Sequence, residues 1–292
     1  MKITGVLPAL TTPLTEDERV NVPVLKEMLT YYLDNKADGF YIGGATGEGL
    51  CLRTEERMIL AEEAVAHVAH RKPCIVQVAS TDFNDAILLA KHAEACGADA
   101  ISATPPIFFP YDEDDVYAYY KALADAVHIP MMIYYNLAAG FHINAKFAAR
   151  MFEVDNITAI KWTSSDYYEM IKLKDMTHGE MNILNGPDQM LLMGLNAGAD
   201  GGIGTTYNFM LGLYQEIYRC FMCKDIKGAQ LAQTKADRVI AAVQKYKLIP
   251  ATKAILEQMG FAVGNATFPM KRYSSEQKKN IIADVREAGL SI

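Results

Sequence analysis

Short apolar runs rich in β-branched and aromatic residues recur along the chain, and each is followed by a segment with helical periodicity. The eight runs span residues 3–13, 39–47, 74–80, 100–106, 130–136, 157–163, 181–187 and 201–206. The intervening segments, such as 54–71 and 83–99, place apolar residues three and four positions apart, with charges on the other face. Apolar strands that alternate with amphipathic helices predict a parallel sheet covered by helices.

The number and spacing of these units favour one architecture. Eight units in roughly 210 residues, without a linker rich in Pro, Gly or Ser, favour a closed (β/α)8 TIM barrel over an open doubly wound sheet. The open sheet also lacks its fingerprint, because no G-x-G-x-x-G follows the first strand. The remaining chain has helical patterns at 207–223, 226–246, 250–260 and 275–289. We therefore predict an α/β barrel domain at 1–222 and a C-terminal helical domain at 223–292.

Composition and charge narrow the range of partners. With 51% hydrophobic and 22% charged residues, the chain has the composition of an ordinary globular protein. A net charge of -7 disfavours nucleic acid or an anionic membrane surface as the main partner, and leaves a small-molecule substrate as the expectation. The chain start does not resemble a signal peptide, and no run of about 18 apolar residues predicts a membrane span, so we expect a cytoplasmic protein.

The five cysteines favour free thiols in a reducing compartment, because their number is odd and most lie in apolar segments. Cys220 and Cys223 have the spacing of half a zinc site. No second pair and no nearby histidine cluster completes that site, so we predict no bound metal.

A barrel predicts where the chemistry lies, because active sites of this fold gather where strands end and βα loops begin. Polar residues at the ends of five predicted strands are therefore candidates. They are Thr46 and Glu48, then Tyr134, Tyr135 and Asn136, then Lys161 and Thr163, then Asp188 and Gln189, and finally Gly204 and Thr205. Each alone has an ordinary explanation as a turn, helix cap or core residue. Their shared position at one end of a barrel favours a site.

Lys161 is the candidate with the clearest chemistry, because in AIKWTSSD it stands at the end of a hydrophobic run that predicts burial. An isolated lysine at a strand end is more often a surface residue with its amine in water. If Lys161 points into the barrel, desolvation favours its neutral amine, which attacks carbonyl groups to form a Schiff base. This chemistry needs a proton shuttle, and we expect the hydroxyl of Tyr135 to lie within reach.

Five motifs in this order, GGATGE, YYN, IKWTSSD, NGPDQ and GADGGIGTTYN, resemble the N-acetylneuraminate lyase and dihydrodipicolinate synthase family of class I aldolases. The resemblance extends over essentially the whole chain. It implies a (β/α)8 barrel with a C-terminal helical domain and a Schiff base between Lys161 and pyruvate or a pyruvoyl substrate. It further implies Tyr135 as the proton relay, no metal or organic cofactor, and a homotetramer.

The resemblance also implies the substrate contacts. The loop after the second strand would hold the pyruvoyl carboxylate through Thr46 and the backbone of Ala45, where many members carry a hydroxyl residue. Tyr111 corresponds to an aromatic residue that some members lend to a neighbouring subunit's site. The residues implied to bind the hydroxyl-bearing tail of the substrate are Thr163, Gly186, Asp188, Gly204 and Thr205.

The motifs of this chain resemble the lyase branch of the family more closely than the synthase branch. The synthase pattern YNVPxRT supplies an arginine for a second carboxylate, whereas this chain has YNLAAGFHI. Lyases usually carry glutamate beside Asp188, whereas Gln189 keeps an acceptor oxygen and lacks the charge. The loop after Tyr135 is also shorter.

The implied reaction is cleavage of N-acetylneuraminate to N-acetylmannosamine and pyruvate. Dihydrodipicolinate synthase, an aldolase or hydratase for another 2-keto-3-deoxy sugar acid, and a non-enzymatic sugar-acid-binding barrel are the alternatives.

Overall fold

The computed structural model describes residues 2–292 and contains an eight-stranded parallel sheet that closes on itself. The strands are β1 (Gly5–Pro8), β2 (Phe40–Ile42), β3 (Cys74–Gln77), β4 (Ala100–Ala103), β5 (Met131–Asn136), β6 (Ile157–Thr163), β7 (Asn182–Asn185) and β8 (Gly201–Gly204). Each strand from β2 to β7 pairs with the next one in the chain, and β8 pairs with β1. The backbone N–H of Leu10 donates to the carbonyl of Tyr41 at 2.8 Å and joins the two remaining edges. The predicted TIM barrel is confirmed, and every predicted run contains a strand.

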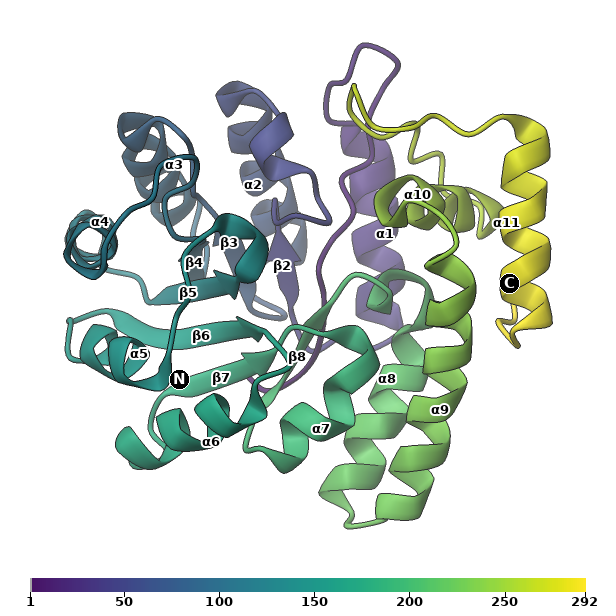
Figure 1. The fold of residues 1–292 in the computed structure, drawn as a ribbon. Helices are drawn as coiled ribbons and strands as arrows, with labels where there is room; N and C mark the ends of the chain where they lie inside the picture. The colour runs from purple at the N-terminus through teal and green to yellow at the C-terminus, as the bar shows by residue number, and fades with distance from the viewer. Residues whose placement is uncertain (1) are drawn as a thin grey trace.

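Helices surround the strands (Figure 1). Those of the barrel are α1 (Val22–Asp34), α2 (Thr54–Val68), α3 (Phe83–Ala95), α4 (Glu113–Asp125), α5 (Ala145–Phe152), α6 (Tyr167–Met176), α7 (Leu191–Asn196) and α8 (Tyr207–Met222). Short 3-10 helices η1 (Gly49–Cys51), η2 (Leu137–Ala139) and η3 (Asp188–Met190) follow β2, β5 and β7. Polar caps fix several starts, as where Asp112 forms a capping box before α4.

Three further helices, α9 (Ile226–Val243), α10 (Leu248–Gln258) and α11 (Ser275–Glu287), gather beside α8 on one side of the barrel (Figure 1). Helix α8 ends at Met222, where the predicted barrel domain ends, and the division into two domains stays a prediction. Among the helices of residues 2–292, none has the length and apolar character that crossing a membrane requires.

Strand residues alternate between two apolar clusters, because successive side chains point to opposite faces of a strand. In β5, Met132 and Tyr134 belong to a small cluster inside the barrel, whereas Ile133 and Tyr135 belong to the large cluster between strands and helices. The inner cluster also contains Ile3, Leu7, Ala9, Tyr41, Ile75, Ala100, Ala159, Leu184 and Ile203. The barrel interior is therefore packed, mainly with apolar side chains.

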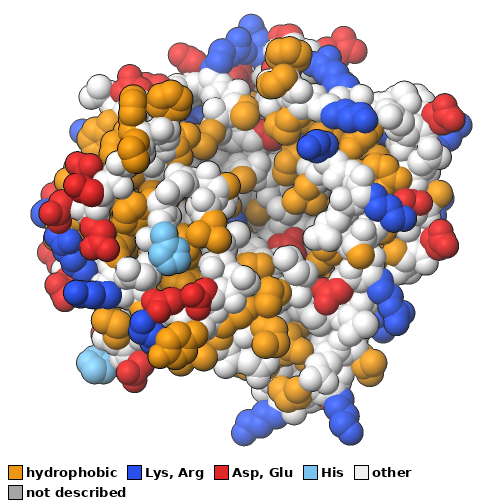
Figure 2. All heavy atoms as spheres, in the orientation of Figure 1, with side chains coloured by type: hydrophobic (Ala, Val, Ile, Leu, Met, Phe, Trp, Pro, Cys, Tyr) orange, Lys and Arg blue, Asp and Glu red, His pale blue; other side chains and the backbone are white. Residues whose placement is uncertain are grey.

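The carboxyl ends of the strands open into a hollow. In Figure 1 the arrowheads of β6 and β7 point toward the middle of the view, and Figure 2, in the same orientation, shows the surface hollowed there. The walls of the hollow are mainly hydrophobic or uncharged, and most charged side chains lie around the periphery (Figure 2). This is the end of the barrel where the predicted site residues belong.

Candidate active site

Lys161 lies inside the barrel, near the end of β6, and its side chain is buried. Its Nζ is 4.4 Å from the ring centroid of Tyr41 and 4.3 Å from that of Tyr134. Lys161 takes part in none of the ion pairs found among residues 2–292. Both aromatic rings therefore contact the amine of Lys161, and no carboxylate of residues 2–292 lies within ion-pair distance of it. The inward orientation expected for a Schiff-base lysine is therefore present.

Tyr41 forms a neutral wall of this chamber. Burial raises the pKa of Tyr41 well above its ordinary value. Its hydroxyl donates to Oγ of Ser102 at 3.0 Å. Since this phenol stays protonated at neutral pH, it adds no negative charge beside Lys161.

The expectation that Tyr135 lies beside Lys161 is wrong, and the neighbouring tyrosine occupies that place. In the pairing of β5 with β6, Tyr134 is opposite Lys161 and Tyr135 is opposite Trp162. Residues paired in this way share a face, so Tyr135 points outward into the layer under the helices. There its hydroxyl contacts Nδ1 of His142 at 2.9 Å, and its ring packs edge-on against Trp162 at 4.9 Å. Of the two tyrosines in the YYN motif, Tyr134 is therefore the one that faces the inner chamber.

The loop after β2, residues 43–49, brings Thr46 to the mouth. The hydroxyl of Thr46 is hydrogen-bonded to that of Thr205 at 2.6 Å, which joins the ends of β2 and β8. The hydroxyl of Thr12 donates to the carbonyl of Gly47 at 2.7 Å and holds the same loop from below. Ala45 is exposed and lines a cavity of about 340 Å³ that also contains Tyr134. The two residues predicted to hold a carboxylate thus lie at the mouth of the barrel.

A cavity of about 510 Å³ lies over the ends of β6, β7 and β8. The predicted tail-binding residues that line it are Thr163, Gly186, Asp188, Gln189 and Thr205. Oγ1 of Thr163 is buried and has no hydrogen-bond partner within residues 2–292. A buried hydroxyl without a partner is uncommon in folded proteins and marks a place where a ligand can bind. The structure therefore brings five of the predicted residues together in one polar cavity.

Two glycines keep this cavity open. A Cβ at Gly186 would collide with Oγ1 of Thr163, and a Cβ at Gly204 would collide with Oδ1 of Asp188. Gly204 does not line the cavity itself. Gly204 therefore contributes to the site indirectly, because its lack of a side chain lets Asp188 lie close to the backbone.

Asp188 has a structural contact that sequence reasoning missed. Its Oδ2 accepts hydrogen bonds from the backbone N–H and the hydroxyl of Thr206, both at 2.7 Å, at the N-terminus of α8. A carboxylate at a helix N-terminus is favoured by the helix dipole. Burial nevertheless raises the pKa of Asp188, and the bonds from Thr206 oppose that rise. Gln189 beside it is exposed at the cavity edge.

The two cavities meet along shared elements. Leu137 of η2 and Leu248 at the start of α10 line the larger cavity, whereas Ala138, Ala139 and Ile249 line the smaller one. The C-terminal helices therefore form part of the wall of the mouth. Sequence reasoning did not predict this contribution, because a contact between distant segments leaves no local pattern.

Tyr111 lies away from the mouth of its own barrel. It lines a separate cavity of about 370 Å³ together with Phe83 and Tyr119, between α3 and α4. Its predicted role in a neighbouring subunit's site stays a prediction.

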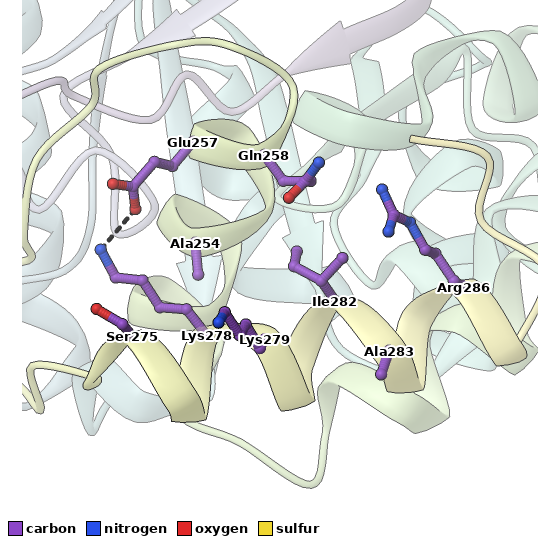
Figure 3. Close-up of a pocket in the computed structure, with 9 residues that line it drawn as sticks. All are labelled: Ala254, Glu257, Gln258, Ser275, Lys278, Lys279, Ile282, Ala283 and Arg286. Atoms are coloured by element: carbon purple, nitrogen blue, oxygen red, sulfur yellow. Dashed lines mark hydrogen bonds and ion pairs between the residues drawn. The ribbon is translucent and has the colours of Figure 1, made fainter.

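A further groove of about 460 Å³ lies between α10 and α11, away from every predicted site residue (Figure 3). Figure 3 shows Lys278 of α11 directed at Glu257 of α10, and the ion pair measures 2.5 Å. The groove is open, and Lys278 already has its counter-ion. Within residues 2–292, no cluster of three or more His, Cys, Asp or Glu side chains is arranged to hold a metal ion.

Comparison with known proteins agrees with this geometry. A model of the dihydrodipicolinate synthetase family matches residues 2–288. The chain belongs to this family. It is 32% identical over 288 residues to the N-acetylneuraminate lyase of Rhizobium meliloti (strain 1021), a match that covers 99% of this chain and 95% of that protein.

Two solved structures share the fold of this chain over nearly its whole length. The Proteus mirabilis N-acetylneuraminate lyase superposes with a TM-score of 0.95, at 28% identity and with 100% of both chains covered. CdNal from Clostridium difficile, solved in complex with mannosamine, gives a TM-score of 0.94 at 28% identity, covering 99% of this chain and 100% of that one. The family predicted from the sequence motifs is thereby confirmed.

Proposed function

We propose that the protein is a class I lyase that forms a Schiff base through Lys161 and cleaves N-acetylneuraminate to N-acetylmannosamine and pyruvate. The observation that carries the proposal is the amine of Lys161, buried between Tyr41 and Tyr134 without a carboxylate counter-ion. The N-acetylneuraminate lyases of similar sequence and shape support the choice of substrate. The expected partner is a small molecule, with no nucleic acid or membrane involved.

The reaction follows from the nucleophilic amine of Lys161 beside a keto acid. Lys161 attacks the C2 carbonyl of the open-chain sugar acid, and loss of water leaves a protonated imine. A base removes the proton of the C4 hydroxyl, the C3–C4 bond breaks, and its electron pair forms an enamine on the pyruvate carbons. C4 becomes the aldehyde carbon of N-acetylmannosamine. Protonation of the enamine at C3 and hydrolysis of the imine then release pyruvate and the free amine.

Tyr134 is the residue we assign to the proton transfers, in place of Tyr135. Its ring lies against Nζ of Lys161, and its hydroxyl accepts a hydrogen bond from Nδ2 of Asn136 at 3.3 Å. It also lines the cavity that contains Ala45, so its side chain reaches both the imine and the entering substrate. A group in this position takes the proton of the C4 hydroxyl and returns it to the enamine.

The carboxylate and the tail of the substrate are assigned to different parts of the mouth. Thr46 and the backbone at Ala45 would hold the carboxylate, and the absence of a hydroxyl at Ala45 removes one hydrogen bond from that clamp. The polar cavity of Thr163, Asp188 and Thr205 would hold the hydroxyl-bearing tail. Mannosamine in the similar Clostridium difficile structure is a ligand of this kind. Gln189, exposed at the cavity edge, offers the tail a neutral amide.

The chemistry of the site needs neither metal nor organic cofactor, since the imine itself accepts the electrons. Dialysis against EDTA should therefore leave the activity unchanged. Five free cysteines suit the reducing cytoplasm that we propose as its location.

Borohydride trapping followed by mass spectrometry tests the proposal. Wild-type protein incubated with pyruvate or with N-acetylneuraminate should gain a pyruvate-sized adduct on Lys161 in both cases, and Lys161→Ala should gain none. An adduct from pyruvate alone would keep the Schiff base but would indicate a different sugar acid or aldehyde as the substrate, and Gln189 is the departure from the lyase pattern that bears on this choice. No adduct from either compound would contradict the proposed function.

A further inference from the structure

A buried ion pair connects the loop after β2 to the C-terminal helices, and the mechanism described above does not use it. Nζ of Lys253, on α10, lies 2.7 Å from Oε1 of Glu48, and both side chains are at most 2% exposed. Lys253 also donates to the carbonyl of Asn265 at 2.8 Å. Oε2 of Glu48 accepts from the backbone N–H of Thr267 at 2.6 Å and from its hydroxyl at 2.9 Å. Both charges thus have hydrogen-bond partners away from water.

The contacts of Glu48 hold an unusual backbone conformation. Glu48 has φ +58° and ψ 23°, in the left-handed region that residues with a side chain rarely adopt. Such a conformation persists only where the surroundings enforce it. The turn is also tight, because the N–H of Glu48 donates to the carbonyl of Ala45 at 3.1 Å, and a Cβ at Gly49 would collide with the carbonyl of Gly43. The position of residues 43–49 therefore depends on what grips Glu48.

The same loop carries the groups assigned to the substrate carboxylate. Thr46 lies two residues before Glu48, and its hydroxyl meets Thr205 of the β8 end at 2.6 Å. A shift of the loop would move the Thr46 hydroxyl and the backbone N–H groups around it together. Lys161, on β6 across the barrel, is held by its own strand and would stay in place.

We propose that Glu48 and Lys253 form a clamp that positions the carboxylate-binding loop, so that the C-terminal helices control the affinity for the keto acid. This inference rests on the proposed function of the site. Glu48 and Lys253 are positioning residues, because they act through Thr46 and Ala45. The clamp acts on binding and leaves the amine and its proton relay unchanged.

Removing one partner should weaken keto-acid binding selectively. Lys253→Met keeps an unbranched side chain that is one atom shorter and leaves Glu48 buried without a counter-charge, which the loop relieves by moving toward water. We expect the pyruvate concentration that gives half-maximal borohydride trapping on Lys161 to rise about tenfold or more, with the maximal trapping rate within about threefold of wild type. Thr267→Val keeps the backbone donor and removes only the hydroxyl, so a rise of about threefold is expected.

Lys174→Met is the matched control. Nζ of Lys174 pairs with Oδ2 of Asp200 at 2.8 Å, and both side chains are mostly buried. Asp200 also accepts from Nδ2 of Asn182 at 3.0 Å, so this pair too belongs to a hydrogen-bonded network. Asp200 directly precedes β8 and lies at the opposite end of the barrel from the mouth. Lys174→Met should lower the melting temperature, as Lys253→Met should. The pyruvate concentration that gives half-maximal trapping should stay at the wild-type value.

The outcomes separate a positioning role from a purely structural one. If Lys253→Met and Thr267→Val both bind pyruvate as wild type does, the clamp contributes stability alone and the inference is wrong. An equal rise in Lys174→Met would likewise contradict it, because general loosening would then explain the effect. If wild-type protein forms no adduct with pyruvate, the proposed function fails, and the clamp's role falls with it.

Discussion

Tyr134 and Tyr135 are adjacent in the chain but face opposite sides of β5, so the same substitution should affect them differently. Tyr134→Phe should lower kcat by about 10²- to 10⁴-fold, because it removes the hydroxyl assigned to proton transfer. Tyr135→Phe loses only the contact with His142, and should keep kcat within about fivefold while lowering stability by about 1 kcal/mol. Steady-state kinetics with N-acetylneuraminate and urea unfolding measure both. Equal losses of kcat would contradict the assignment to Tyr134.

The sequence allowed the reactive lysine to be predicted but not its tyrosine partner. Lys161 is distinguished by a charged residue in an apolar run, which is a local pattern. The motif YYN offers two tyrosines, and the one that faces inward depends on how β5 pairs with β6. That pairing contains a register shift between Met131 and Met132. A register of this kind is set by contacts between strands, so the motif alone could not decide it.

The raised pKa of Asp188 predicts that the stability of the protein depends on pH. Burial raises its pKa above the ordinary value of 3.8, so its contribution to stability is fully present below pH 3.8 and is lost as pH rises through the folded-state pKa. Asp188→Asn removes this loss at neutral pH and keeps an acceptor for the N–H of Thr206. The free energy of unfolding of the variant, relative to that of wild type, should therefore be larger at pH 7 than at pH 4. Urea unfolding at both pH values measures this, and a difference independent of pH would contradict it.

At the scale of elements, η1 places Cys51 where the substrate should protect it. Cys51 is exposed and lines the cavity of Ala45 and Tyr134, whereas Cys223 is exposed beyond the end of α8. Burial raises the pKa of the Cys74 thiol far above its ordinary value, so this thiol should react only after unfolding. Labelling with iodoacetamide, read by mass spectrometry, should modify Cys51 and Cys223 in the native protein. Added pyruvate should slow the labelling of Cys51 and leave that of Cys223 unchanged as its internal control; equal protection of both would contradict the placement of Cys51 at the site.

Strands and helices could be predicted because each has a periodicity of its own, and all eight predicted strand runs and four later helices are present. The contribution of α10 to the mouth could not, since Lys253 and Glu48 are brought together only by folding. The pattern of α10 indicates a buried face but not what covers it. The 3-10 helices that follow β2, β5 and β7 were also missed, because segments of three residues carry no period.

At the scale of the whole molecule, one exposed pair of aromatic side chains bears on assembly. Phe108 and Phe109, in the loop between β4 and α4, are 89% and 64% exposed, and their rings contact each other at 4.9 Å. Phe108 also has φ +88°, a strained conformation for a residue with a side chain. Exposed aromatic pairs of this kind are typical of protein interfaces. The loop also carries Tyr111, the residue that the family resemblance assigns to a neighbouring subunit.

The homotetramer implied by the family resemblance is therefore a proposal that this loop can test. Wild-type protein should sediment with a mass near four times the 32.3 kDa of one chain. Phe108→Ser should shift the population toward smaller species at low micromolar concentration, because it removes an aromatic anchor from the interface. Leu231→Ser on α9 changes an apolar side chain that is 67% exposed and should leave the mass unchanged. If Phe108→Ser keeps the wild-type mass at every concentration, this loop is not part of the interface. If it dissociates and kcat falls with the tetramer fraction, a neighbouring subunit completes the site.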